Sequence, residues 1–84
     1  MRTYVRIIFK LTDKENEKYY IGKVCVYDYK TKEQIYANWH NVPFIKRMAK
    51  KFETDFDNIE FEILEYDIPH IPMEDVRKKY SSKN

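Results

Sequence analysis

Apolar and polar residues alternate in the first part of the chain, residues 3–11. One side of the alternation consists of Val5, Ile7, Phe9 and Leu11. The other side consists of Tyr4, Arg6, Ile8 and Lys10. A period of two is typical of a β-strand with one buried face. We therefore predict a strand here, with the first set facing the core.

Three more strands are predicted further along the chain. Residues 19–29 are rich in β-branched and aromatic side chains, which favours a second strand antiparallel to the first. Gly22 within this segment indicates a bulge or a close backbone approach. Residues 35–39 are predicted to form a short third strand. Residues 59–66 alternate again and are predicted to form a fourth strand with an acidic outer face.

An amphipathic helix is predicted between the third and fourth strands, at residues 43–53. Asn41 is expected to cap it, and Pro43 falls in its first turn, where a missing N–H costs no hydrogen bond. Its apolar stripe consists of Phe44, Ile45, Met48, Ala49 and Phe52. Its opposite face carries Lys46, Arg47, Lys50 and Lys51.

A short helix at residues 73–80 is predicted to end the fold. It has acidic residues at its start and basic residues at its end, which matches the helix dipole. The prolines of residues 67–72 make the segment before it extended.

These elements predict an α+β fold with the order β-β-β-α-β-α. We expect an antiparallel sheet of three to four strands, one amphipathic helix packed on a face and a short C-terminal helix. Eighty-four residues allow one domain, residues 1–80, with residues 81–84 as a frayed tail. No apolar run reaches the length of a membrane span, so we expect a cytoplasmic protein with no membrane partner.

Charge is unevenly distributed along the chain. Residues 1–52 carry a net +7, residues 53–76 a net −9 and residues 77–84 four basic groups, although the total is only +2. Two interpretations are open. The acidic strand neutralises the basic elements inside the fold, or the two blocks lie on different faces and the basic face meets nucleic acid or an acidic protein surface. Imitation of nucleic acid by the acidic block is a minor third interpretation.

The predicted basic helix and the tyrosines are the candidate binding features. Like charges four residues apart on the helix repel each other by a few tenths of a kcal/mol, roughly, and phosphates would offset that repulsion. Aromatic and basic side chains interleaved on a sheet bind single-stranded nucleic acid, and the same types are common in protein interfaces. The alternatives are a solvated helix face and tyrosines that complete the core. The candidates are Lys46, Arg47, Lys50, Lys51, Arg6, Lys23, Tyr4, Tyr20 and Tyr27.

No catalytic residue, metal or cofactor is expected. His40 and His70 could form an acid and base pair for metal-free RNA cleavage, but each lies at a predicted structural boundary where capping or packing is commoner. Residues 55–58 lack the glycine and the terminal glutamate of a calcium-binding loop. Cys25 has no partner for a disulfide and is expected to act as a small core residue.

The triplet Tyr20-Ile21-Gly22, at the end of a predicted hairpin and followed by a helix containing Arg47, resembles a fragment of the GIY-YIG nuclease family. The resemblance implies a second tyrosine-containing triplet on the first strand and a metal-binding glutamate on a later helix. Here Arg6-Ile7-Ile8 stands where Gly-Ile-Tyr is expected, and no glutamate is clearly placed in an equivalent helix. These departures put nuclease activity in doubt.

The whole chain resembles in composition the small accessory proteins of T4-like bacteriophages. It is short, rich in lysine, glutamate, isoleucine and tyrosine, and has one glycine. The resemblance implies an early protein that redirects host machinery or blocks host defences by binding protein or RNA, in the host cytoplasm. It assigns no role to any residue.

The sequence therefore predicts a small non-enzymatic binding protein for RNA or single-stranded nucleic acid, which acts as a regulator or inhibitor of a host factor. The alternative is a protein-binding inhibitor that uses the tyrosine-rich sheet or its edge strand without nucleic acid. A degenerate GIY-YIG-like nuclease is the second alternative. An exposed edge strand in so small a protein also makes a homodimer an open possibility.

Overall fold

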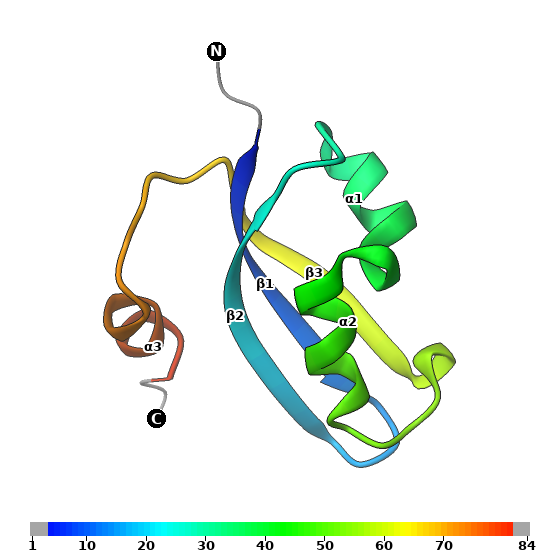
Figure 1. Ribbon diagram of the computed structural model, residues 1–84. Coiled ribbons are helices and arrows are strands. Elements are labelled where there is room, and N and C mark those ends of the chain that lie inside the picture. Colours follow the sequence, from blue (N-terminus) through cyan, green and yellow to red (C-terminus); the bar gives the residue numbers. More distant parts are fainter. Residues whose placement is uncertain (1–3, 82–84) are drawn as a thin grey trace.

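A three-stranded antiparallel sheet with helices on both faces forms the computed structural model of this chain, which describes residues 4–81 (Figure 1). The predicted α+β class is confirmed. The elements in chain order are β1 (Val5–Asp13), β2 (Lys18–Val26), α1 (Lys32–Asn38), the 3₁₀ helix η1 (Trp39–Asn41), α2 (Pro43–Lys50), the 3₁₀ helix η2 (Phe56–Asn58), β3 (Ile59–Tyr66) and α3 (Met73–Ser81).

β1 is the central strand, and the order across the sheet is β2-β1-β3. β1 and β2 form a hairpin in which Val5 lies opposite Val26 and Asp13 lies opposite Lys18. β3 pairs with the other side of β1, with a register shift at Ile8. The strand that is last in sequence is therefore added next to the first strand.

The main core lies between the sheet and the layer made by α1, η1 and α2 (Figure 1). The inward sides predicted for the first and last strands are confirmed, because their alternate residues are buried there. The buried side chains of this core are those of Val5, Ile7, Phe9, Leu11, Val26, Ile35, Val42, Ile45, Ala49, Ile59, Phe61 and Ile63. Trp39 stacks on Phe61 with the ring centroids 5.6 Å apart, which closes the core beside η1.

α3 packs on the opposite face of the sheet. Ile8, Ile68 and Val76 form a second, smaller buried cluster there. Ile8 was expected on the outward side of its strand, and it does point away from the main core, but α3 leaves its side chain 0% exposed. The sheet is thus covered on both faces at this point, rather than on one.

The predicted third strand at residues 35–39 is wrong, because this segment lies in α1 and η1. The element order is therefore β-β-α-α-β-α. The hydroxyl of Thr31 caps α1 by accepting a hydrogen bond from the Gln34 N–H, and the Gln34 side chain accepts one from the Lys30 N–H. A Thr-x-x-Gln capping pattern outweighs the strand preference of the isoleucine and aromatic residues that follow it.

Several boundaries also differ from the prediction. Val42 is the N-cap of α2 and makes no side-chain capping bond, because Asn41, the predicted cap, belongs to η1. α2 ends at Lys50 and β2 ends at Val26, so Tyr27 and Tyr29 lie outside the strand. Of the frayed tail expected at residues 81–84, Ser81 belongs to α3 and the rest lies outside the described residues.

Candidate functional site

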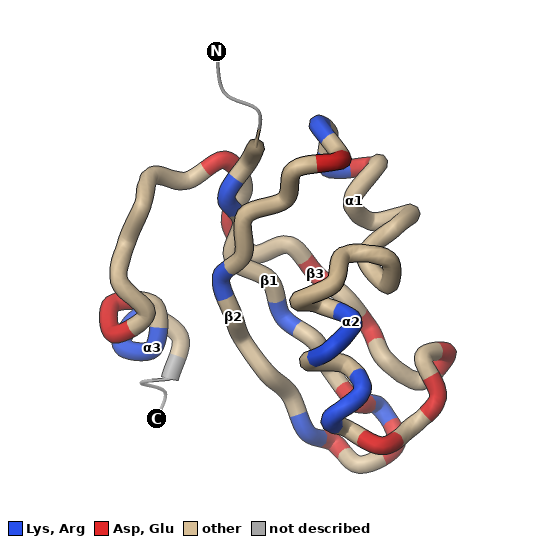
Figure 2. The backbone as a smooth tube through the Cα atoms, in the orientation of Figure 1, with Lys and Arg blue, Asp and Glu red and all other residues tan. Residues whose placement is uncertain are grey.

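The outer face of α2 carries a band of exposed cations, shown in blue in Figure 2. Its members, which we call the α2 cations, are Lys46, Arg47, Lys50 and Lys51, the last of which follows the helix directly. Ile45 and Ala49 are fully buried on the other side of α2 and fix its rotation. Packing of the apolar stripe therefore obliges the cations to face solvent.

None of the α2 cations forms an ion pair with a carboxylate of the described residues 4–81. The Arg47 guanidinium lies 6.0 Å from the centre of the Phe44 ring, a contact that leaves its hydrogen-bond donors free. The mutual repulsion predicted within this band is thus not relieved by a partner in the described part of the chain.

β3 does not shield these cations. Ile59, Phe61 and Ile63 point into the core below α2, so the alternating Glu60 and Glu62 project from the opposite face of the sheet. Other acidic residues lie in the segment that joins α2 to β3, beside the C-terminal end of the basic band (Figure 2). The carboxylates of β3 therefore lie on a different face from the α2 cations, whereas the acidic residues between α2 and β3 border only the C-terminal end of the band (Figure 2).

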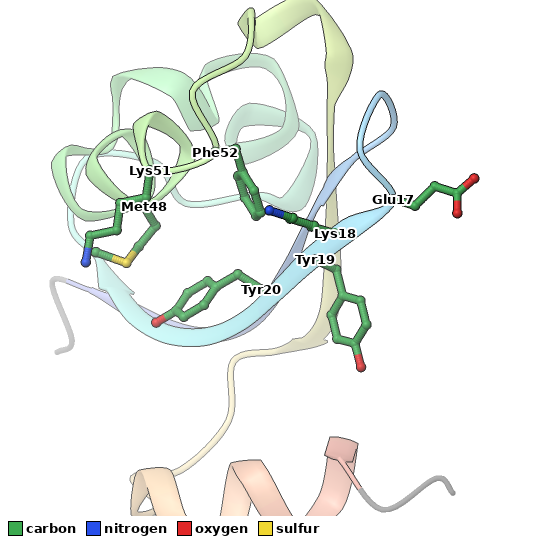
Figure 3. Close-up of a pocket in the computed structure, with 7 residues that line it drawn as sticks. All are labelled: Glu17, Lys18, Tyr19, Tyr20, Met48, Lys51 and Phe52. Carbon is green, nitrogen blue, oxygen red and sulfur yellow. The ribbon is translucent and has the colours of Figure 1, made fainter.

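A groove of about 600 Å³ lies between the C-terminal half of α2 and β2, beside the α2 cations (Figure 3). It is lined by Glu17, Lys18, Tyr19, Tyr20, Met48, Lys51 and Phe52. The side chains of Glu17 and Tyr19 point away from it (Figure 3). The remaining side chains give an apolar and aromatic floor with a lysine on each side.

The position of Tyr20 depends on Gly22. A Cβ atom at Gly22 would lie 2.6 Å from Cε2 of Tyr20 and 3.1 Å from Cζ of Phe9, so only glycine leaves room for both rings. The Tyr20 and Phe9 ring centroids are 6.0 Å apart. Gly22 forms neither the predicted bulge nor a close approach of a second backbone: its pairing with β1 is regular, two side-chain rings lie over it, and the register shift of the sheet lies between β1 and β3.

The other predicted binding residues lie on the face opposite α2. Tyr4 packs on Tyr27 with centroids 5.6 Å apart, and the Arg6 guanidinium lies 5.1 Å from the centre of the Tyr4 ring. Lys23 donates a hydrogen bond from Nζ to the backbone carbonyl of Ile71 at 2.6 Å, which ties the segment before α3 to β2. The structure therefore brings Tyr20 next to the α2 cations and separates Tyr4, Arg6, Lys23 and Tyr27 from them.

The two histidines are not brought together. His40, in η1, borders a pocket of about 360 Å³ with Trp39, Phe56, Asp57 and Ile59, on the same side of the sheet as α2. His70 is exposed in the segment that leads to α3, on the other side. An acid and base pair of the two histidines is not formed in this arrangement.

The residues that carry the nuclease resemblance are also divided between the faces. The Tyr20 side chain lies on the α2 face of β2, and Arg47 lies on α2. Ile8, in the triplet where a tyrosine was expected, is buried beneath α3 on the other face. Glu74, in the first turn of α3, is likewise beyond the sheet. The position of the expected first-strand tyrosine, occupied by Ile8, and Glu74 thus both lie across the sheet from Tyr20 and Arg47.

Two carboxylates have lowered pKa values: Asp13, which lies opposite Lys18 of the groove in the hairpin, and Glu65, which lies on the α3 face. The Asn16 side-chain amide and the backbone N–H groups of Asn16 and Glu15 donate to Asp13 and hold its pKa below the ordinary 3.8. Hydrogen bonds from Lys79 and Tyr80 lower the pKa of Glu65. Both carboxylates fasten structural elements, the hairpin turn and α3, and neither faces the α2 cations.

Sequence reasoning missed three residues of the groove. Met48 and Phe52 were placed on the buried stripe of the helix, but both are only partly buried at the border of the core. The predicted second strand begins at residue 19, but Lys18 is the first residue of β2. No signal in the sequence marks these positions, because the end of the apolar stripe faces β2 only in the folded structure.

The described residues contain no group of three or more histidine, cysteine, aspartate or glutamate side chains that could hold a metal ion. Within the same part of the chain, every helix is too short or too polar to cross a membrane. Comparison with family models, with curated proteins and with solved structures finds no match to this chain.

Proposed function

We propose that this chain is a non-enzymatic protein that binds single-stranded nucleic acid, RNA in particular, through the outer face of α2. The observation that carries the proposal is the band of four exposed cations without an ion-pair partner in residues 4–81. As a regulator or inhibitor of a host factor, the protein would bind an RNA segment through this face and prevent that segment from binding its usual partner.

Two further observations support the proposal. The carboxylates of β3 project from the opposite face of the sheet, so they do not cancel the field over α2. The groove beside the cations has an aromatic floor, and an aromatic surface next to a basic track is the usual arrangement in proteins that bind single strands. A duplex would use only the cations, whereas a single strand can use both features.

The test is the affinity for a short fluorescein-labelled oligouridine across a salt series, measured by fluorescence anisotropy. If four phosphates are neutralised, the slope of log K against log salt concentration is about −3, because each contact with a single strand contributes roughly −0.7. Changing Lys46, Arg47, Lys50 and Lys51 to alanine is expected to flatten the slope and to weaken binding at low salt by more than tenfold.

The matched control changes the same number of exposed lysines elsewhere, at Lys14, Lys30, Lys32 and Lys78. Both variants lower the net charge by four, so the comparison isolates the position of the cations from their number. Equal losses in the two variants, or a slope near zero for the unaltered protein, would sink the proposal.

The protein-binding alternative rests on the Tyr4, Arg6 and Tyr27 cluster of the opposite face. It predicts a captured host protein that survives nuclease treatment and is lost on changing Tyr27, not the α2 cations. The nuclease alternative predicts Mg²⁺-dependent cleavage of the oligonucleotide that is lost on replacing Tyr20. Each result is distinct from salt-dependent binding without cleavage.

A further inference from the structure

The groove between α2 and β2 offers a site for a flat apolar group next to the α2 cations. Its volume of about 600 Å³ falls within the range of roughly 300–1,000 Å³ that is usual for small-molecule pockets. Met48 and Phe52 from the α2 side and Tyr20 from β2 form its apolar lining (Figure 3). These three side chains are partly buried against the main core, so the site is largely formed before anything binds.

Of the two β2 tyrosines that line the groove, Tyr19 points away from it, and Tyr20 is the ring that its strand and a neighbouring side chain support (Figure 3). The ring lies along the strand over Gly22, and Phe9 contacts it from the neighbouring strand. A ring supported in this way loses little conformational entropy when a second flat group stacks on it, because its rotamer is already restricted. The geometry thus favours stacking rather than insertion of a flexible chain.

The charges around the groove specify an anionic occupant. Lys51 stands on the α2 side and Lys18 on the β2 side of the opening, and Lys50 continues the basic band along the helix (Figures 2 and 3). Glu17, the acidic residue of the lining, points its side chain away from the opening (Figure 3). A nucleotide within a strand has these two properties: a flat base, and a negatively charged phosphate on either side of it.

We infer that this groove takes an unstacked base of single-stranded nucleic acid, stacked on Tyr20, with the flanking phosphates on Lys18 and Lys51. The inference rests on the proposed function and adds a base-binding subsite to its phosphate track. The proposed occupant is a base. The alternative occupant is an apolar side chain of a protein partner, and the experiments below distinguish the two.

The experiment compares two labelled oligouridines with the same number of phosphates, one complete and one in which every nucleotide is abasic. The unaltered protein is expected to bind the complete strand more tightly by roughly 5- to 100-fold, the range for loss of one stacked base. The Tyr20→Leu variant is expected to lose that preference while keeping the salt slope, and Tyr20→Phe is expected to retain it. Tyr27→Leu, an exposed tyrosine on the opposite face, serves as the control.

A second measurement needs no variant and so does not depend on how Tyr20→Leu folds. The fluorescence of a 2-aminopurine base within the oligouridine should fall on binding to the unaltered protein, because stacking on an aromatic ring quenches it. Equal affinity for the complete and abasic strands, together with unchanged 2-aminopurine fluorescence, would overturn the inference but leave the phosphate track intact.

The two proposals fail in different ways. If the unaltered protein binds neither strand at low salt, the proposed function fails and the base site with it. If it binds both strands equally with a steep salt slope, only the base site fails. A capture experiment in which Tyr20→Leu loses a protein partner that resists nuclease treatment would assign the groove to an apolar side chain and overturn the base site.

Discussion

Tyr36 protects the outer edge of the sheet by hydrogen-bonding to an edge N–H group of β3. From α1 its hydroxyl accepts a hydrogen bond from the Ile63 N–H of β3 at 2.9 Å, although the side chain is 43% exposed. Its ring also contacts Phe61 edge-on, with centroids 5.4 Å apart. One residue thus satisfies a strand N–H and packs on the core.

Changing Tyr36 to phenylalanine removes the hydroxyl and keeps the ring contact. The variant is expected to lose about 1 kcal/mol of the free energy of unfolding, because the Ile63 N–H loses its acceptor inside a partly buried site. Urea denaturation measures the loss. Tyr27→Phe, at a position that is 61% exposed, should leave the stability unchanged, and an equal loss in both variants would contradict the assignment.

Three residues with a left-handed backbone are not glycines, so the sequence does not mark their positions. Glu17, Glu53 and Asp67 have φ angles of 58°, 56° and 58°, in the left-handed region that usually selects glycine or asparagine. The chain has a single glycine, and it lies inside β2, where space rather than backbone angle requires it. The single glycine therefore does not mark the positions where the backbone is left-handed.

At the scale of elements, clean periodicity predicted β1, β3 and α2, whereas mixed signals misplaced α1. Each of the first three buries its apolar residues mainly on one face, with Ile8 of β1 as the exception, so its apolar spacing directly reports its geometry. The α2 cations could be predicted for the same reason. The groove could not, because its lining comes from two elements whose contact depends on the tertiary fold.

α3 is fastened to the sheet by a polar contact as well as by its buried face. Glu65 of β3 accepts hydrogen bonds from Nζ of Lys79 and from the hydroxyl of Tyr80, both in α3. These bonds lower the pKa of Glu65 below its ordinary 4.5. Burial and the hydrogen bond to Glu65 raise the pKa of Tyr80 to about 12.

The docking of α3 should therefore depend on pH at both extremes. The contribution of Glu65 is present above pH 4.5 and is lost as the pH falls through its lowered folded pKa. The contribution of neutral Tyr80 is present below pH 10 and is lost as the pH rises through about 12.

Amide hydrogen exchange in α3, followed during acid titration, measures the first effect. Protection of α3 should fall below pH 4.5 while β1 stays protected, since β1 is held by the larger core. Glu65→Gln removes the acid dependence specific to this contact, and Glu60→Gln, which is exposed, keeps it. Simultaneous loss of protection in α3 and β1 would show that α3 does not open separately.

At the scale of the whole molecule, the small net charge conceals two charged faces. The cations of α2 and the outward carboxylates of β3 are separated by the helix layer and the sheet. The molecule is 18 Å across its shortest axis, whereas the screening length at physiological salt is about 8 Å. A ligand on one face is thus largely screened from the charges of the other.

This separation predicts unequal effects of charge changes. Glu60→Gln with Glu62→Gln raises the net charge by two, and the affinity for oligouridine at physiological salt is expected to rise less than twofold, because of screening. Lys46→Ala with Arg47→Ala lowers the net charge by two and is expected to weaken binding several-fold more. Anisotropy titrations compare the pairs, and effects of equal size would mean that only net charge matters.

The unequal edges of the sheet limit how copies of this chain could assemble. Tyr36 occupies part of the outer edge of β3 and α1 lies beside it, whereas no strand of the described residues pairs with the outer edge of β2 (Figure 1). Sheet extension is therefore favoured on one side only. Two copies joined at β2 in antiparallel fashion would be related by a twofold axis, and both β2 edges would then be paired; the remaining edges would be those of β3, which Tyr36 partly occupies. Pairing of β2 edges therefore stops at two copies, so the β2 edge that permits a dimer does not support a filament.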